Sequence, residues 1–211
     1  MTLLIATAVE AEADAIRAGL RPGVAIVAAV GVGAPAAAAA TARLLALAEA
    51  AGHPYRAVLS AGIAGGFPDR ADLGATVLAA RSIAADLGAD APDGFIPLDA
   101  LGFGTTTIDA DPELLAALRA ALPGAVAGDV LTVNTVTGTA ERAKALAGRY
   151  PAAAAEAMEG YGVACAAATA GLPFAELRTV SNPVGPRDRA SWRIPTALAA
   201  LTTNATRLPL P

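Results

Sequence analysis

Short apolar runs alternate with alanine-rich helical segments along the chain, a pattern typical of an α/β protein. The apolar runs lack the regular polar alternation of a strand with one wet face, so we expect a mostly parallel sheet covered by helices on both faces. The pattern predicts strands over Leu3–Ala6, Val24–Val30, Ala57–Ser60, Ala75–Ala80, Val126–Val133 and Phe174–Val180. It predicts helices over Glu10–Leu20, Pro35–Ala50, a segment that begins at Pro112, Ala140–Ala147, Ala164–Ala170 and Ile194–Thr206.

Several segments between these elements carry local signals of their own. Asp111 and Pro112 suit the N-cap and the first turn of a helix. Gly62–Gly66 is expected to be a loop after the third strand, where glycines let backbone N–H groups approach a ligand. Asp86–Gly104 is rich in Gly, Pro and Asp and is expected to be a long loop that could contain a short strand. Neither an internal repeat nor a linker is visible, so we expect one domain over residues 1–211.

Composition and charge exclude several classes of function. The net charge is −4, no Lys/Arg cluster stands out, and only four Phe and three Tyr are present, which argues against a nucleic-acid surface. No apolar run reaches the length of a membrane span, and the first residues lack a basic leader. The single cysteine, Cys165, cannot form an internal disulfide and fits a reducing compartment. We therefore expect a cytoplasmic protein that binds neither nucleic acid nor membranes.

Metal and triad chemistry find no support in the sequence. His53 is the only histidine, and it lies between a helix and a strand in Gly-His-Pro, where a surface position is expected. No Cys or His spacing suits zinc, and no Gly-x-Ser-x-Gly elbow is present. We expect no metal and no organic cofactor.

Two acidic positions are candidates for chemistry. Glu10 and Glu12 follow the first strand, where a carboxylate can act as a general base toward water, although acids are also common in the first turn of any helix. Glu159 is flanked by small and apolar residues, and a buried carboxylate there would need partners such as two sugar hydroxyls. A solvent-facing glutamate on a helix remains the alternative for Glu159.

A polar motif closes the last apolar strand. Arg178 and Ser181-Asn182-Pro183 stand where the chain leaves the sheet, and ligands in such folds bind at the carboxyl ends of strands. Asn182 carries both a donor and an acceptor, which suits reading the edge of a base. An Asx-type turn would also favour asparagine at this position.

Four motifs in order resemble the nucleoside phosphorylase/nucleosidase superfamily. They are Glu-x-Glu after the first strand, Ala-Gly-Gly in mid-chain, Met-Glu, and Arg-x-x-Ser-Asn, and they span nearly the whole chain. Within the superfamily the chain resembles the futalosine hydrolases of the alternative menaquinone pathway. The stretches that carry this likeness are Leu87–Phe95, Asn134–Gly138, and Ser181–Gly185 with the Arg-Asp-Arg and Trp192 that follow. The resemblance implies a three-layer fold with a central, mixed and mostly parallel twisted sheet.

The resemblance also implies roles for single residues. Glu12 matches the carboxylate that activates water in methylthioadenosine/S-adenosylhomocysteine nucleosidases. Glu159 matches the carboxylate that holds the ribose hydroxyls, and Met158 matches the thioether beside the sugar. Ala64 and Gly65 match a loop near base and sugar.

The base end of the site is implied in the same way. Val136 and Thr137 fall at the base-stacking positions, and Ser181 precedes the residue at the base edge. Adenine-specific nucleosidases have an aspartate where this chain has Asn182, which cannot protonate adenine N7 but can donate to a 6-oxopurine. Asn182 therefore favours hypoxanthine, the base of futalosine, over adenine.

The expected substrate carries a charged group on its 5′ side. Futalosine carries a benzoate-type carboxylate on its 5′ extension. Arg187, Arg189 and Arg193 are candidates to bind this carboxylate, unless they are ordinary surface arginines.

The family implies a homo-oligomer, a dimer or a multiple of dimers, that binds a small-molecule nucleoside. A purine nucleoside phosphorylase, an adenine-specific nucleosidase and a non-catalytic nucleoside sensor are the competing interpretations.

Overall fold

The computed structural model describes residues 2–209, so the outermost ends of the expected 1–211 domain lie outside the described residues. An eight-stranded sheet forms the middle of the protein, and a separate two-stranded sheet lies beside it. The strands are β1 (Thr2–Thr7), β2 (Ala25–Ala29), β3 (Tyr55–Gly66), β4 (Thr76–Ala84), β5 (Gly88–Ala91), β6 (Gly94–Pro97), β7 (Thr107–Asp109), β8 (Val126–Thr132), β9 (Ala153–Ala157) and β10 (Phe174–Pro183).

The sheet is mixed and mostly parallel, as predicted. Strands β2, β1, β3 and β10 pair in parallel, and so do β4, β8 and β9. β10 pairs antiparallel with β4, and β9 pairs antiparallel with the far end of β3. Strands β3, β10, β4, β8 and β9 therefore form a closed circuit of pairings. This circuit brings the carboxyl ends of β3, β9 and β10 together.

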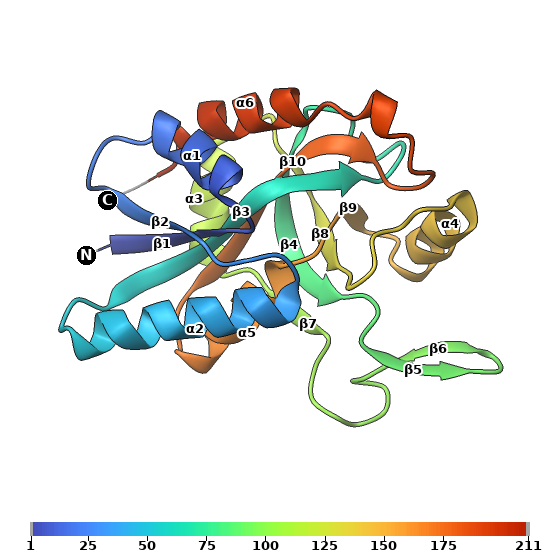
Figure 1. Ribbon diagram of the computed structural model, residues 1–211. Coiled ribbons are helices and arrows are strands. Elements are labelled where there is room, and N and C mark those ends of the chain that lie inside the picture. The colour runs from blue at the N-terminus through green and yellow to red at the C-terminus, as the bar shows by residue number, and fades with distance from the viewer. Residues whose placement is uncertain (1, 210–211) are drawn as a thin grey trace.

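Helices cover both faces of the sheet, which gives the predicted three layers (Figure 1). The helices are α1 (Glu10–Gly19), α2 (Ala34–Ala50), α3 (Pro112–Ala121), α4 (Ala140–Arg149), α5 (Gly160–Thr169) and α6 (Ile194–Ala205), with a 3-10 turn at Arg189–Ser191. α1 and α6 pack together on one face, and α2 and α5 on the other (Figure 1). The predicted N-cap Asp111 accepts hydrogen bonds from two backbone N–H groups at the start of α3.

Adjacent strand residues are buried on opposite faces, which explains the lack of polar alternation in the sequence. On β1, Leu4 joins the core beneath α2 and α5, whereas Ile5 joins the core beneath α1 and α6. Val58 and Leu59 on β3 divide in the same way. A strand between two helical layers has no wet face, and therefore needs apolar residues at every position.

The glycine-rich segment differs from the prediction. Gly62–Gly66 is not a loop, because β3 continues through it and pairs with β10 on one side and β9 on the other. The glycines are needed because neighbours approach closely. A Cβ on Gly62 would lie 2.6 Å from Glu12 Oε1, and one on Gly66 would lie 2.2 Å from the Ala71 carbonyl oxygen.

The segment 86–104 is more ordered than expected. It contains the β5–β6 hairpin, which projects beyond the main sheet (Figure 1), before a loop leads to the short strand β7. Ala153–Ala155 lie in the buried strand β9, where small side chains allow close packing.

The structure also gives the exposure of the histidine and the cysteine and the character of the helices. His53 is exposed, as expected, and Cys165 is partly buried. Over residues 2–209, no helix is both long and apolar enough to cross a membrane.

The contact between α2 and α5 generates a prediction about stability. A Cβ on Gly162 would lie 2.1 Å from the Ala34 carbonyl oxygen, so Gly162→Ala must push the two helices apart. We expect a loss of about 1–3 kcal/mol in the free energy of unfolding, measured by denaturant titration. Gly148→Ala on exposed α4, where nothing lies within 4 Å, is the control and should gain about 0.5–1 kcal/mol. Equal stability of the two variants would contradict this account.

Candidate active site

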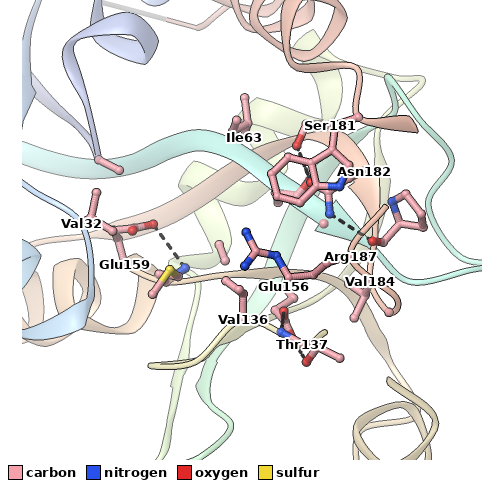
Figure 2. Close-up of a pocket in the computed structure, with 18 of the residues that line it drawn as sticks. Val32, Ile63, Val136, Thr137, Glu156, Glu159, Ser181, Asn182, Val184 and Arg187 are labelled. Carbon is pink, nitrogen blue, oxygen red and sulfur yellow. Dashed lines mark hydrogen bonds between the residues drawn. The ribbon is translucent and has the colours of Figure 1, made fainter. Parts of the chain in front are cut away.

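A cavity of about 270 Å³ opens at the carboxyl ends of β1, β3, β9 and β10. Figure 2 shows its labelled side chains converging from strands and loops that are far apart in the sequence. All of the predicted site residues except Arg189 and Arg193 line it: Glu12, Ala64, Gly65, Val136, Thr137, Met158, Glu159, Ser181, Asn182 and Arg187. The cavity therefore assembles residues that the sequence placed at separate strand ends.

Glu12 lies in the first turn of α1 and turns back toward the end of β1. Its Oε2 accepts hydrogen bonds from the backbone N–H groups of Ala8 (2.9 Å) and Val9 (3.3 Å), and its Oε1 accepts one from Ile63 (2.8 Å). The residue is 3% exposed, whereas Glu10 in the same turn is exposed and pairs with Arg17. Three backbone donors hold the Glu12 carboxyl group at the cavity edge.

Glu159 precedes α5 and is also buried, with 6% of its surface exposed. Its Oε1 accepts a hydrogen bond from the backbone N–H of Gly33 at 3.1 Å, and its Oε2 accepts one from Met158 at 3.3 Å. The alternative of a solvent-facing helix glutamate is therefore wrong. Its carboxyl group lines the cavity from the α2–α5 side.

A buried arginine lies behind these two carboxyl groups. Arg178 is 1% exposed; its Nε lies 2.8 Å from Glu176 Oε1, and its Nη1 lies 3.7 Å from Glu159 Oε2. Burial alone would lower the pKa of Arg178, but the charges of Glu176, Glu159 and Glu12 outweigh it and raise that pKa. Arg178 is thus held as a cation within a group of carboxylates.

Further hydrogen bonds fix this group in the core. Arg178 Nη2 donates to Ser60 Oγ at 3.1 Å, and the Ser82 hydroxyl donates to Glu176. A Cβ on Gly160 would lie 2.1 Å from Glu176 Oε1, so only glycine fits at the start of α5. Arg178 is buried, and the low dielectric of a protein interior strengthens its electrostatic interactions.

Asn182 is oriented by its neighbour. The Ser181 hydroxyl donates to Asn182 Oδ1 at 2.8 Å, and Asn182 Nδ2 donates to the Pro183 carbonyl at 3.0 Å (Figure 2). An amide nitrogen carries two N–H donors, so one remains for a ligand in the cavity. The arrangement presents Asn182 as a hydrogen-bond donor.

Glu156 is a site residue that the sequence reasoning missed. It is 6% exposed on β9 and lines the cavity, and its carboxyl oxygens accept from Thr137 N (2.8 Å) and Thr137 Oγ1 (2.5 Å). Burial raises the pKa of the Glu156 carboxyl group, and the bonds from Thr137 oppose that rise. A charged residue inside the alanine-rich run Ala152–Ala157 was the signal that could have identified it.

The three candidate arginines lie in different surroundings. Arg187 lines the cavity, and Figure 2 shows its guanidinium group pointing inward. The guanidinium carbons of Arg187 and Arg189 lie 5.7 and 5.6 Å from the ring centre of Trp192, which also lines the cavity. Arg193 donates to the carbonyls of Ala190 and Trp192 within its own loop. Of the three, only Arg187 reaches the cavity.

Metal ligation is not apparent in the part of the chain that the structure describes. Across residues 2–209, no three His, Cys, Asp or Glu side chains gather as a metal site requires. The cavity instead combines carboxyl groups, one amide, one arginine and apolar surface, which suits a polar ligand with a planar part.

The chain is similar to proteins of known family. The family model for the phosphorylase superfamily matches residues 9–209. A futalosine hydrolase of Streptomyces coelicolor is 51% identical over 96% of this chain and 92% of its own length. A futalosine hydrolase of Acidothermus cellulolyticus is 57% identical over 54% of this chain and 48% of its own length.

Solved structures share the fold at lower identity. Futalosine hydrolase of Helicobacter pylori superposes with a TM-score of 0.81 at 19% identity, covering 99% of this chain and 97% of that one. S-adenosylhomocysteine nucleosidase from Streptococcus pyogenes gives 0.81 at 22% identity, covering 100% and 98%. On the family match and the full-length relative, the chain belongs to the phosphorylase superfamily and, within it, to the futalosine hydrolase family.

Proposed function

We propose that this protein hydrolyses the N-glycosidic bond of futalosine, releasing hypoxanthine and dehypoxanthine futalosine in the futalosine route to menaquinone. The full-length relative from Streptomyces coelicolor, which carries that activity in its name, supports the substrate. The observation that supports the reaction type is the cluster of carboxyl groups beside the cavity, of which Glu12 and Glu159 line it. Glu12, Glu159 and Glu176 surround one guanidinium, that of Arg178.

The excess of carboxyl groups over guanidinium groups beside the sugar position favours a hydrolase over a phosphorylase. A phosphorylase must bind phosphate beside the sugar, and that anion needs free cationic groups. Here the buried Arg178 already faces the carboxyl groups of Glu176 and Glu159, and Glu12 lies at the cavity edge. Excess negative charge repels phosphate and stabilises a sugar that becomes cationic as the C–N bond breaks.

The proposed mechanism assigns roles at the sugar to three cavity residues, Glu12, Glu159 and Met158. Glu12, fixed by three backbone N–H groups, orients a water molecule and removes its proton as the water attacks the anomeric carbon. Glu159 accepts hydrogen bonds from the ribose hydroxyls, and Met158 packs beside the sugar. The bonding electrons leave with the purine, whose N7 and O6 then carry negative charge.

Asn182 stabilises that departing base. Ser181 holds its Oδ1, so its Nδ2 faces the base as a donor to O6 or N7 of hypoxanthine. Val136 contributes an apolar wall for the ring, while Ala64 and Gly65 leave room for it. An amide cannot transfer a proton to adenine N7, which is why we propose a 6-oxopurine rather than a 6-aminopurine.

The 5′ extension and the assembly complete the proposal. Arg187 is the cavity residue that we assign to the substrate carboxylate.

Val9, Val32 and Val136 are 42, 56 and 39% exposed at the cavity mouth, where a neighbouring subunit would cover them. We therefore propose a homo-oligomer, a dimer or a multiple of dimers, acting in the cytoplasm on a small nucleoside without a cofactor.

Base release in phosphate-free buffer tests the function directly. We expect chromatography to show hypoxanthine from futalosine and little from inosine, which lacks the 5′ extension. Adding phosphate should leave the rate unchanged. Release only after phosphate is added would make the protein a phosphorylase, and binding without turnover would make it a sensor.

Glu12→Gln tests the water-activating role. The amide keeps the size but cannot accept a proton, so kcat should fall by about 10²–10⁴. Glu10→Gln is the matched control, because Glu10 lies in the same turn but outside the cavity, and its kcat should match the wild type. An unchanged kcat in Glu12→Gln would remove this role from the residue.

Arg187→Ala tests the contact with the 5′ carboxylate. Loss of a charge-assisted hydrogen bond should raise KM for futalosine roughly 10- to 100-fold, with KM for inosine unaffected. Arg189→Ala removes a cation from the same loop outside the cavity and should leave both KM values unchanged. An equal rise in Arg189→Ala or Arg193→Ala would assign the carboxylate elsewhere.

A further inference from the structure

Glu176 is a charged side chain in the core that the mechanism above does not use. It lies on β10, is 0% exposed, and stands outside the cavity lining. Its Oε1 accepts a hydrogen bond from Arg178 Nε at 2.8 Å, and its Oε2 accepts one from the Ser82 hydroxyl. A buried carboxylate is costly even when it is paired, so its place behind the cavity calls for an explanation.

Arg178 is shared unequally between two carboxyl groups. Its Nε makes the close contact with Glu176, whereas its Nη1 lies 3.7 Å from Glu159 Oε2, which is beyond hydrogen-bond distance. The charge of Glu176 also raises the pKa of Arg178 more than that of Glu159 does. Arg178 Nη2 donates to Ser60 Oγ, which fixes the plane of the guanidinium group. The cation therefore stands beside Glu159 without using its acceptor sites.

The Glu159 carboxyl group consequently keeps acceptor sites for a ligand. Its two oxygens accept hydrogen bonds from the backbone N–H groups of Gly33 and Met158. A carboxylate has about four acceptor sites, so about two remain. These are the sites that the proposed function assigns to the ribose hydroxyls, and a direct hydrogen bond from Arg178 would take one of them.

Close packing holds Glu176 and Arg178 in place. Gly160 follows Glu159, and a Cβ there would lie 2.1 Å from Glu176 Oε1. A Cβ on Gly62 would lie 2.8 Å from Arg178 Nη1. Because the backbone leaves the guanidinium little room to swing away, the loss of one counter-charge would leave it beside the other.

We propose that Glu176 is a positioning residue that holds the Arg178 guanidinium away from Glu159, so that the Glu159 oxygens stay free to accept the ribose hydroxyls. The inference rests on the proposed function, because it concerns the sugar-binding carboxylate of that site. Glu176 touches neither the substrate nor the attacking water. Its charge balances the buried cation, which otherwise would draw Glu159 into a direct hydrogen bond.

Glu176→Gln removes the charge and keeps the shape. The amide oxygen of glutamine can accept from Arg178 Nε, and its N–H can donate to Ser82 Oγ. Arg178 then lacks its main counter-charge, and we expect it to donate a hydrogen bond to Glu159. The ribose loses a charge-assisted hydrogen bond, so kcat/KM for futalosine should fall roughly 10- to 100-fold.

The readout specific to this role is the dependence on the ribose hydroxyls. Futalosine is compared with its 2′-deoxy and 3′-deoxy forms, one of which lacks the hydroxyl that Glu159 Oε2 accepts. For that form, the loss caused by Glu176→Gln should be at least about fivefold smaller than for futalosine. A structural defect would lower kcat/KM by the same factor for all three substrates, and that result would overturn the inference.

Two matched variants separate the charge of Glu176 from its packing. Glu176→Asp keeps the charge and should keep the wild-type ratio of kcat/KM between futalosine and its deoxy forms. Asp129→Asn removes the charge of a second buried carboxylate, which pairs with Arg81 from β8 outside the cavity, and should also keep this ratio. A shift of the ratio in either control as large as in Glu176→Gln would overturn the inference.

A measurement on the wild-type enzyme does not depend on how the variants fold. Formycin B is a 6-oxopurine-type nucleoside whose carbon–carbon glycosidic bond is not hydrolysed. A crystal structure of its complex should show ribose hydroxyls bound to Glu159, with Arg178 still paired to Glu176. A direct hydrogen bond between Arg178 and Glu159 in this complex would overturn the inference. Failure of the wild type to release base without phosphate would instead overturn the proposed function.

Discussion

The ionic contacts of Arg178 are the constraint on which the site depends. Isolated buried carboxylates are costly, yet Glu12, Glu159 and Glu176 are all nearly or fully buried around this one guanidinium. Backbone N–H groups supply the remaining hydrogen bonds to Glu12 and Glu159. Removing one partner from such a group commonly costs about 3–5 kcal/mol, because the others are left buried and uncompensated. Stability and the proposed catalysis therefore depend on the same charges.

The closed circuit of strands makes this concentration of charge possible. Because β3 pairs with β10 and then with β9, residues from three strand ends face one cavity. Two glycines allow the backbone to approach these carboxyl groups closely. Gly62 on β3 lies beside the Glu12 side chain, and Gly160 at the start of α5 lies beside the Glu176 side chain.

The proposed chemistry divides the cavity into three electrostatic regions. Around the sugar, acidic groups outnumber the buried cation, which favours positive charge on the ribose and disfavours an attacking anion. At the base edge, Asn182 presents a hydrogen-bond donor, which suits the O6 and N7 acceptors of a 6-oxopurine. At the mouth, Arg187 provides positive charge beside Trp192. A nucleoside with an anionic 5′ extension fits all three regions together.

The sequence by itself determined the order and type of the six helices and of β1, β2, β3, β4, β8 and β10, but it did not identify β9. The apolar runs without polar alternation require a sheet covered on both faces. The motifs of the superfamily also predicted Glu12, Glu159 and Asn182 as site residues, and all three line the cavity. Only the tertiary structure decided that Gly62–Gly66 is strand, because its partners β9 and β10 come from distant segments. For the same reason, Glu156 and the choice of Arg187 over its neighbours were visible only once the chain was folded, since a side chain's surroundings depend on strand register and loop path rather than on local sequence.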